Sequence, residues 1–165
     1  MIGGTKRNVI SLIEQNTAWY HDTLTGQAFT GGTMVLGVAA QQTHIQLWNP
    51  VASGKIGILE QIHVWVQVAT SLLFRTYNIA LAAEGTYVEI NKYIGGAAPG
   101  LMVKMISSGP AIGNTFTRIF IPANVFHTIS FSKPFIIPEG QSLVVACQTL
   151  DVDLEATFEW NEVPV

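Results

Sequence analysis

The chain has 165 residues, a formal net charge of −3 and only 12% charged residues. Its length fits one domain with a sizeable core, and its charged fraction is about half the roughly 25% of typical domains. The net charge argues against a nucleic-acid binder, for which a basic stripe is expected. No stretch of the chain reaches the roughly 18 uninterrupted apolar residues of a membrane span. The low charge also indicates a surface that partly faces other protein, because interface cores are poor in Lys, Glu and Asp.

Residues 1–32 show no sustained hydrophobic period. Residues 8–15 allow a short helix of marginal length, and residues 23–32 are rich in turn-forming Gly and Thr. We therefore predict an extended N-terminal arm over residues 1–32, lying on the domain or on a neighbour, with a disordered tail as the alternative. Residues 33–165 form the predicted β-sandwich domain.

Four residues of this arm are candidates for binding a partner. Lys6 and Arg7 are adjacent cations, and Trp19 and Tyr20 are aromatic residues outside any alternating run. Aromatic side chains offer a large contact area for few frozen torsions, which makes them frequent interface anchors. The apolar run after the cations, residues 9–13, is too short for a signal peptide, so export by that route is not expected.

From residue 33 onward the chain is a series of short strand-like runs separated by turn signals. The predicted strands are 33–38, 44–48, 56–68, 73–81, 87–90, 101–106, 117–121, 127–131, 143–147 and 154–160. This pattern predicts an all-β fold, a jelly-roll-like β-sandwich of eight to ten strands. An immunoglobulin-like sandwich is the second choice, although Trp48 and Trp65 have no cysteine pair to match the disulfide of that fold.

The clearest pattern lies near the C-terminus. Apolar residues occupy alternate positions there: Leu154, Ala156, Phe158 and Trp160. A period of two predicts one buried and one solvated face, and the fully apolar run 143–147 predicts a strand covered on both faces. Because Glu159 falls on the solvated face, we expect Glu159→Ala to change stability by no more than about 0.5 kcal/mol.

Two other strands carry a similar alternation. In the run 56–68, Ile56, Ile58 and Ile62 share the apolar phase, but Glu60 falls on the same phase. A β-bulge near Leu59 and Glu60 would restore the pattern. The run 73–81 is the next predicted strand, and its alternating set is Leu73, Arg75, Tyr77, Ile79 and Leu81.

Motifs that could carry chemistry are few. Ser53-Gly54-Lys55 is similar to the end of a phosphate-binding loop, but the first glycine of that loop is missing and Ile56 replaces its hydroxyl residue, so we predict a turn. The only cysteine, Cys147, excludes an internal disulfide framework and is expected to be a buried small hydrophobe. The histidines lie on different predicted elements without metal-ligand spacing: His21, His44, His63 and His127.

Asp151, Asp153 and Glu155 offer oxygen ligands for a hard cation such as calcium. No glycine-bearing loop follows them, and Glu155 already has an outward position on a strand. A solvated acidic turn is therefore preferred, with calcium as the alternative. We predict no metal or cofactor site, no catalytic residue and no enzymatic activity.

Two segments of the chain resemble small virion proteins of tailed bacteriophages. They are IQLWNPVASGK at residues 45–55 and KPFIIPEGQSLVVACQ…ATFEWNEVP at residues 133–164. The resemblance covers about residues 44–165, with the arm outside it. It implies a β-sandwich or jelly-roll protein that decorates or cements the head or sits in a tail structure, without catalytic residues.

The resemblance implies a capsid decoration or cement protein, bound to the major capsid protein or another virion protein and located in the virion after assembly in the host cytoplasm. The low charge and the all-β pattern predict a homo-oligomer, a trimer first and a two-fold dimer second. The alternative function is a tail-associated receptor- or carbohydrate-binding sandwich. Most aromatic residues lie in strand-like runs rather than in loops, which favours the cement protein.

Overall fold

The computed structural model describes residues 27–85, 87, 89–109 and 112–165, and these residues form strands and no helix. The strands are β1 (Ala28–Val35), β2 (Gln42–Asn49), β3 (Lys55–Val66), β4 (Thr70–Tyr77), β5 (Ala83–Glu84), β6 (Ile90–Asn91), β7 (Met102–Ser108), β8 (Asn114–Ile121), β9 (His127–Ile137), β10 (Gln141–Cys147) and β11 (Leu154–Pro164). The described part thus contains no helix long and apolar enough to cross a membrane. The predicted all-β class is confirmed.

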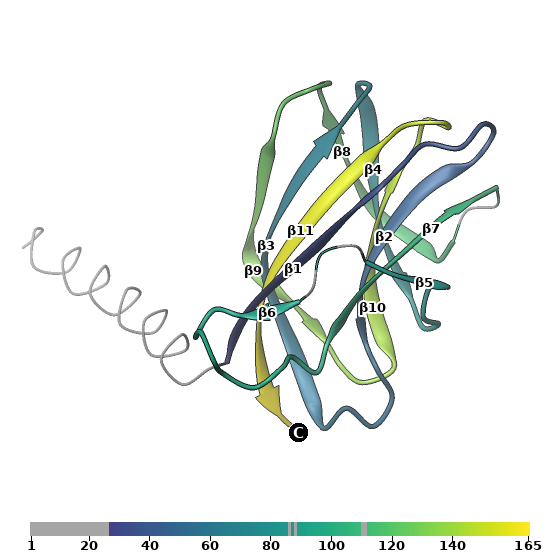
Figure 1. The fold of residues 1–165 in the computed structure, drawn as a ribbon. Coiled ribbons are helices and arrows are strands. Elements are labelled where there is room, and N and C mark those ends of the chain that lie inside the picture. The colour runs from purple at the N-terminus through teal and green to yellow at the C-terminus, as the bar shows by residue number, and fades with distance from the viewer. Residues whose placement is uncertain (1–26, 86, 88, 110–111) are drawn as a thin grey trace, which may run out of the picture.

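The strands form two antiparallel sheets that pack face to face (Figure 1). Their orders are β6-β1-β11-β3-β9 and β5-β7-β2-β10-β4-β8. Without β5, β6 and β7, four strands remain in each sheet, β1-β11-β3-β9 and β2-β10-β4-β8. The chain changes sheet at every connection between these eight strands except β4 to β8. This is the connectivity of a jelly roll, which was the first choice from the sequence.

An insertion between β4 and β8, residues 78–113, accounts for the three remaining strands. Its strand β7 pairs with β2 along the edge of one sheet, and β6 pairs with β1 along the edge of the other. The insertion therefore covers the edge of β2 along nearly its whole length and the edge of β1 only at Phe29 and Thr30. Covering an edge in this way prevents unwanted strand pairing there.

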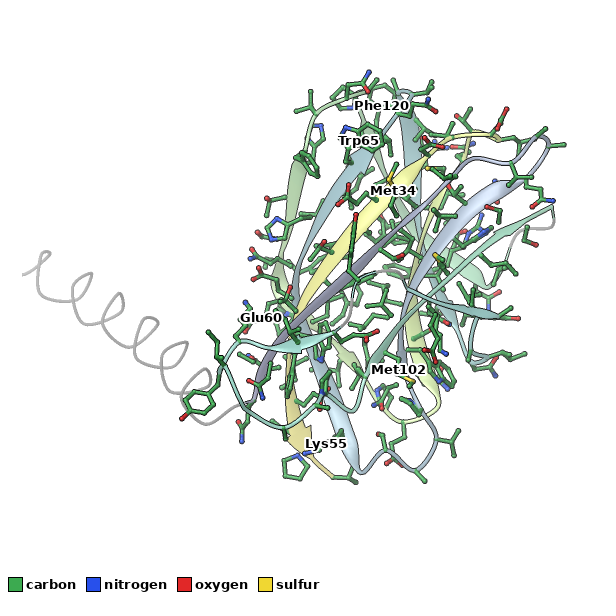
Figure 2. The ribbon with its side chains drawn as sticks, in the orientation of Figure 1. Met34, Lys55, Glu60, Trp65, Met102 and Phe120 are labelled. Atoms are coloured by element: carbon green, nitrogen blue, oxygen red, sulfur yellow. The ribbon has the colours of Figure 1, made fainter. Side chains whose placement is uncertain are left out.

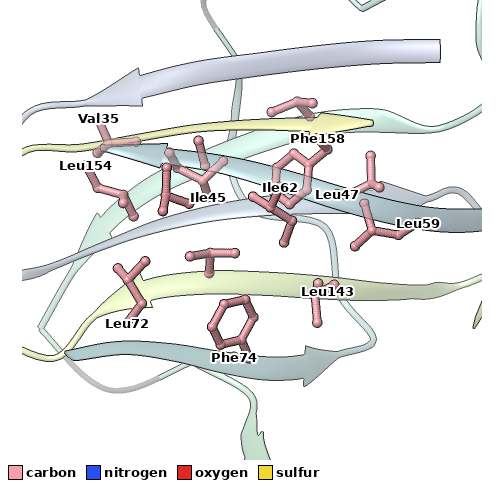
Figure 3. Close-up of a cluster of buried hydrophobic side chains, with 14 of the residues drawn as sticks. Val35, Ile45, Leu47, Leu59, Ile62, Leu72, Phe74, Leu143, Leu154 and Phe158 are labelled. Atoms are coloured by element: carbon pink, nitrogen blue, oxygen red, sulfur yellow. The ribbon is translucent and has the colours of Figure 1, made fainter. Parts of the chain in front are cut away.

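The core lies between the sheets, and β11 is central to it. The inward residues Leu154, Ala156 and Phe158 have no exposed surface. Phe158 points toward Ile62 of the neighbouring β3 within a cluster that also includes side chains of the opposite sheet (Figure 3). The predicted alternation in the last strand is confirmed.

Strand β10 is buried on both faces, as predicted. Its inner face packs in the core, and its outer face is covered where residues 78–82 of the insertion cross the sheet. There the side chain of Gln46 donates a hydrogen bond to the carbonyl of Ile79 and accepts one from the amide of Leu81. A neutral amide thus satisfies the backbone groups that lie over the sheet.

The predicted bulge in β3 is present. The pairings of β3 skip Glu60, which is exposed, and the register shifts between Leu59 and Gln61. The bulge also changes which side chains face the core before it. Leu59 points inward and is buried, whereas Ile56 and Ile58 lie on the outer phase, so their predicted inward orientation is wrong.

In strand β4 the alternating set that begins at Leu73 is not the set that faces the core. Leu72 and Phe74 belong to the core, and Arg75 lies on the outer face of the sheet. The strand ends at Tyr77, so Leu81 lies beyond it in the insertion. Both phases of this strand are buried, and alternation alone therefore could not identify the core face.

The N-terminal boundary also differs from the prediction. Strand β1 begins at Ala28, so residues 28–32 belong to the sheet and not to an arm. Phe29 stacks on Trp160 with ring centroids 6.0 Å apart. Gly32 lies within β1, and a Cβ there would lie 2.5 Å from the Thr157 hydroxyl. This glycine therefore allows close packing of β1 on β11 and does not mark a turn. The rest of the predicted arm, residues 1–26, is outside the described residues.

We predict that Phe158→Ala destabilises the protein by about 3–5 kcal/mol, because it removes a fully buried ring and leaves a cavity between the sheets. Glu155→Ala, on the outer face of the same strand, is the matched control and should stay within about 0.5 kcal/mol. Chemical denaturation of both variants measures the difference. Equal losses would contradict the facing of β11.

Candidate functional site

The partner-binding residues predicted from the sequence, Lys6, Arg7, Trp19 and Tyr20, lie outside the described residues, as does His21. Their role stays a prediction. The candidate sites within the described part can be compared directly, and most of them have a structural explanation.

The Ser53-Gly54-Lys55 motif is a tight turn between β2 and β3, as predicted. The Ser53 hydroxyl donates to the side-chain oxygen of Asn49 at 2.6 Å and accepts from the amide of Lys55 at 3.2 Å. Gly54 has a φ of 70°, which favours glycine.

The predicted burial of Cys147 is also confirmed, and this burial raises the pKa of its thiol to about 11, so the thiol is inert at neutral pH.

The three acidic residues that could have bound calcium, Asp151, Asp153 and Glu155, make separate contacts in the structure. Asp153 accepts a hydrogen bond from the amide of Gly37 at 2.7 Å, and the amide of Asp151 donates to the carbonyl of Gln41 at 2.9 Å. Glu155 lies on the outer face of β11. Within the described ranges, no three His, Cys, Asp or Glu side chains gather as metal ligands would.

The main candidate site is one end of the sandwich, which we call the apolar loop end. It consists of the loops 36–41, 67–69, 122–126 and 148–153 with the adjoining end of strand β8. Seven large apolar side chains are exposed there: Leu36, Val38, Val68, Phe120, Val125, Phe126 and Leu150. Phe120 lies at this end in Figure 2, whereas Lys55 lies at the other. Phe120 and Phe126 are each 67% exposed.

The charge of the apolar loop end is sparse and of one sign. Its four loops contain Asp151 and Asp153 but no Lys, Arg or His. Grouped apolar side chains with few charges are typical of a protein-binding surface. The absence of cations from these loops is unfavourable for an anionic membrane surface, where basic residues supply much of the attraction.

Hydrogen bonds join these loops to one another and to their strands. Besides the two bonds that connect loop 148–153 to loop 36–41, the amide of Gln67 donates to the carbonyl of Asp153 at 3.1 Å. The amide of Asn124 donates to the carbonyl of Val66 at 2.9 Å. The apolar side chains are therefore presented on a surface that is already ordered, which lowers the entropy lost on binding.

A polar network crosses the outer face of the sheet that contains β3, β9 and β11. Glu159 accepts from the ammonium of Lys92 at 2.8 Å and from the amide of Gln61 at 2.6 Å, and it contacts a ring nitrogen of His63 at 3.3 Å. The other ring nitrogen of His63 lies 3.0 Å from the Thr128 hydroxyl. Burial acts to raise the pKa of Glu159, but the hydrogen bonds from Lys92 and Gln61 prevail and lower it.

Thr128, His63 and Glu159 lie in a row, and the Glu159 carboxylate also accepts hydrogen bonds from the side chains of Gln61 and Lys92. The row connects β3, β9 and β11 and stabilises the sheet. The expectation that Glu159→Ala would be nearly neutral is revised accordingly. Glu159→Ala removes a carboxylate that contacts Gln61, His63 and Lys92, so it should lower the free energy of unfolding by about 1–2 kcal/mol.

A second polar cluster is buried on the outer face of the β2 sheet. His44 has no exposed surface, and Arg75 is only 3% exposed. Arg75 donates to the Nε2 atom of His44 at 3.2 Å, to the Thr115 hydroxyl at 2.9 Å and to the carbonyl of Ile112 at 3.3 Å. Burial and the charge of Arg75 lower the pKa of His44 to about 4. The imidazole is therefore neutral and accepts from Arg75, with its Nδ1–H donating to the carbonyl of Gln42.

We predict that His44 makes the protein less stable as the pH falls from about 6.5 to about 4. In this window the unfolded chain, with an ordinary histidine pKa of about 6.5, binds a proton that the folded protein excludes. The loss should approach about 3 kcal/mol, and Glu159 adds its own loss only below its ordinary pKa of 4.5. Urea denaturation at several pH values measures it. His44→Gln should flatten the curve between about pH 6.5 and 5. An unchanged slope would show that His44 does not exclude the proton.

Comparison with known proteins leaves the family open. No protein-family model, no curated protein and no solved structure matches this chain. The jelly-roll connectivity therefore rests on the sheet order of the chain itself. The resemblance to small virion proteins stays a prediction from residues 45–55 and 133–164.

Proposed function

We propose that this chain is a structural protein of a phage particle, a capsid decoration or cement protein that binds the major capsid protein or another virion protein through its apolar loop end. The observation that carries the proposal is the gathering of seven exposed apolar side chains, six on hydrogen-bonded loops without a cation and Phe120 at the end of β8. A surface of this kind is suited to burial against protein.

The energetics favour such an interface. Full burial of an aromatic side chain such as Phe120 or Phe126 contributes about 1.5–3 kcal/mol. Little is lost to ordering, since the loops are fixed by their own hydrogen bonds. The low charged fraction of the chain and its resemblance to small virion proteins support the same role. Residues 1–26 could add a second contact through Lys6, Arg7, Trp19 and Tyr20.

We also propose that the protein forms a homo-oligomer, and we expect a trimer first. A row of aromatic rings supports this by extending from the core to the surface between β8 and β9. Phe131 lies 6.4 Å from Phe74 and 4.7 Å from Phe135, and Phe135 lies 5.3 Å from Phe116, as measured between ring centroids. Phe116 is 45% exposed, and β8 and β9 are the outer strands of their sheets. This side offers apolar surface to a second copy.

We predict that the double variant Phe120→Ser, Phe126→Ser stays folded but no longer binds particles assembled without the protein. It removes the two most exposed rings of the apolar loop end without touching the core. Co-sedimentation with the particles measures binding, and thermal unfolding checks the fold.

The matched control is Val51→Ser, because Val51 is 76% exposed in the turn between β2 and β3 at the opposite end. It should bind as the unmodified protein does. Deleting residues 1–26 tests the arm separately and leaves β1 intact, which a deletion to residue 32 would not. Unchanged binding of the double variant would refute attachment through the apolar loop end.

We predict that the purified protein sediments as a trimer at micromolar concentration. A stable association should bury at least about 1,200–2,000 Å² in total. Phe116→Ser should weaken it, since Phe116 is the exposed end of the aromatic row. A monomer alone would contradict the proposal, and a dimer would replace the trimer with two-fold symmetry.

A further inference from the structure

A polar pocket lies at the end of the sandwich opposite the apolar loop end. It forms where β4 ends and where β8 and β10 begin, whereas the apolar loop end lies where β4 begins and where β8 and β10 end. The pocket has a volume of about 380 Å³ and is lined by Thr76, Tyr77, Asn78, Gly113, Asn114 and Gln141. This volume is within the range of small-molecule sites, about 300–1,000 Å³.

The side chains of the pocket are rich in hydrogen-bonding groups and carry no charge. Asn78, Asn114 and Gln141 each present an amide that both donates and accepts, and all three are exposed. Within the described part of the chain, these three amides have no hydrogen-bond partner. They are therefore free to bind a ligand without first breaking a bond inside the protein.

The wall of the pocket is fixed from behind. Gly113 has a φ of 74°, and a Cβ there would lie 2.5 Å from the carbonyl oxygen of Thr76, so only glycine allows this close approach to β4. Arg75 binds both sides of the same segment, through the carbonyl of Ile112 and the hydroxyl of Thr115. On the other side, the Ser142 hydroxyl donates to the carbonyl of Tyr77 at 2.7 Å.

We propose that this pocket binds a neutral sugar unit of a glycan. An ionic ligand would bury its charge beside lining residues that offer no opposite charge. Neighbouring hydroxyl groups of a sugar, by contrast, both donate and accept, as the three amides do. The site is independent of the proposed structural role, because it lies at the other end of the fold.

The test uses the full-length protein and an array of immobilised neutral and sialylated oligosaccharides, followed by titration calorimetry with the neutral sugar that binds best. We expect binding to neutral glycans and none that depends on sialic acid. Asn114→Ala combined with Gln141→Ala should weaken the affinity at least about tenfold, which corresponds to about 1.4 kcal/mol.

Gln67→Ala is the matched control, because it removes an exposed amide at the apolar loop end. It should leave the sugar affinity unchanged, and thermal unfolding should show that all variants are folded. The inference is overturned if the unmodified protein binds no neutral glycan, or if the double variant binds as tightly as the control. The double variant Phe120→Ser, Phe126→Ser should lose particle binding but keep its sugar affinity. The two proposals can therefore fail separately.

Discussion

The buried carboxylate of Glu162 is the constraint on which the arrangement of this fold depends. It continues the inward phase of β11 beyond Trp160, yet it carries a carboxyl group and is only 3% exposed. An unpaired carboxylate at such a position would cost several kcal/mol. The amides of Gly100 and Leu101 and the indole N–H of Trp160 satisfy it, at 2.9–3.0 Å.

These bonds fix the insertion to the sheet. Because Gly100 and Leu101 must face Glu162, the segment that leads into β7 is held over the end of β11. Leu101 packs against Gly57 of β3, where the missing Cβ leaves room for its side chain. Strand β7 then pairs along the edge of β2, and β6 pairs with the start of β1. The sandwich is left with two free ends and with β8 and β9 as its exposed side.

The jelly-roll connectivity gives the two ends different characters. Each strand carries the chain from one end to the other, so loops that are distant in the sequence meet at the same end. At one end they bring together apolar side chains, and at the other they form a pocket with neutral amides. One end can therefore bind protein while the other stays accessible to solvent and to a small ligand.

The sequence predicted those features that depend on neighbours in the chain. Alternation identified the inward face of β11, and a misplaced Glu60 located the bulge of β3. It did not identify the core face of β4, because residues on both faces of that strand are buried. It also took Gly32 as a turn signal, although this glycine allows close packing on Thr157.

The candidate sites depended still more on contacts between distant residues. Leu36, Val68, Phe126 and Leu150 come from four separate loops, and only the sheet order brings them to one end. A different long-range contact does have a signal in the sequence, because Glu162 lies on the same phase as Trp160 and Phe158. A charged residue on an otherwise apolar phase indicates a buried partner, and here the partner is a backbone segment about 60 residues away.

If the proposed role in a phage particle holds, the orientation of the protein in the intact particle tests the central claim most directly. Electron cryo-microscopy of the virion would show which end of each sandwich contacts the lattice. We expect the apolar loop end, with Phe120 and Phe126, to be buried against another virion protein, and the pocket beside Tyr77 to face outward. A sandwich whose apolar loop end projects into solvent while the opposite end contacts the particle would contradict this assignment.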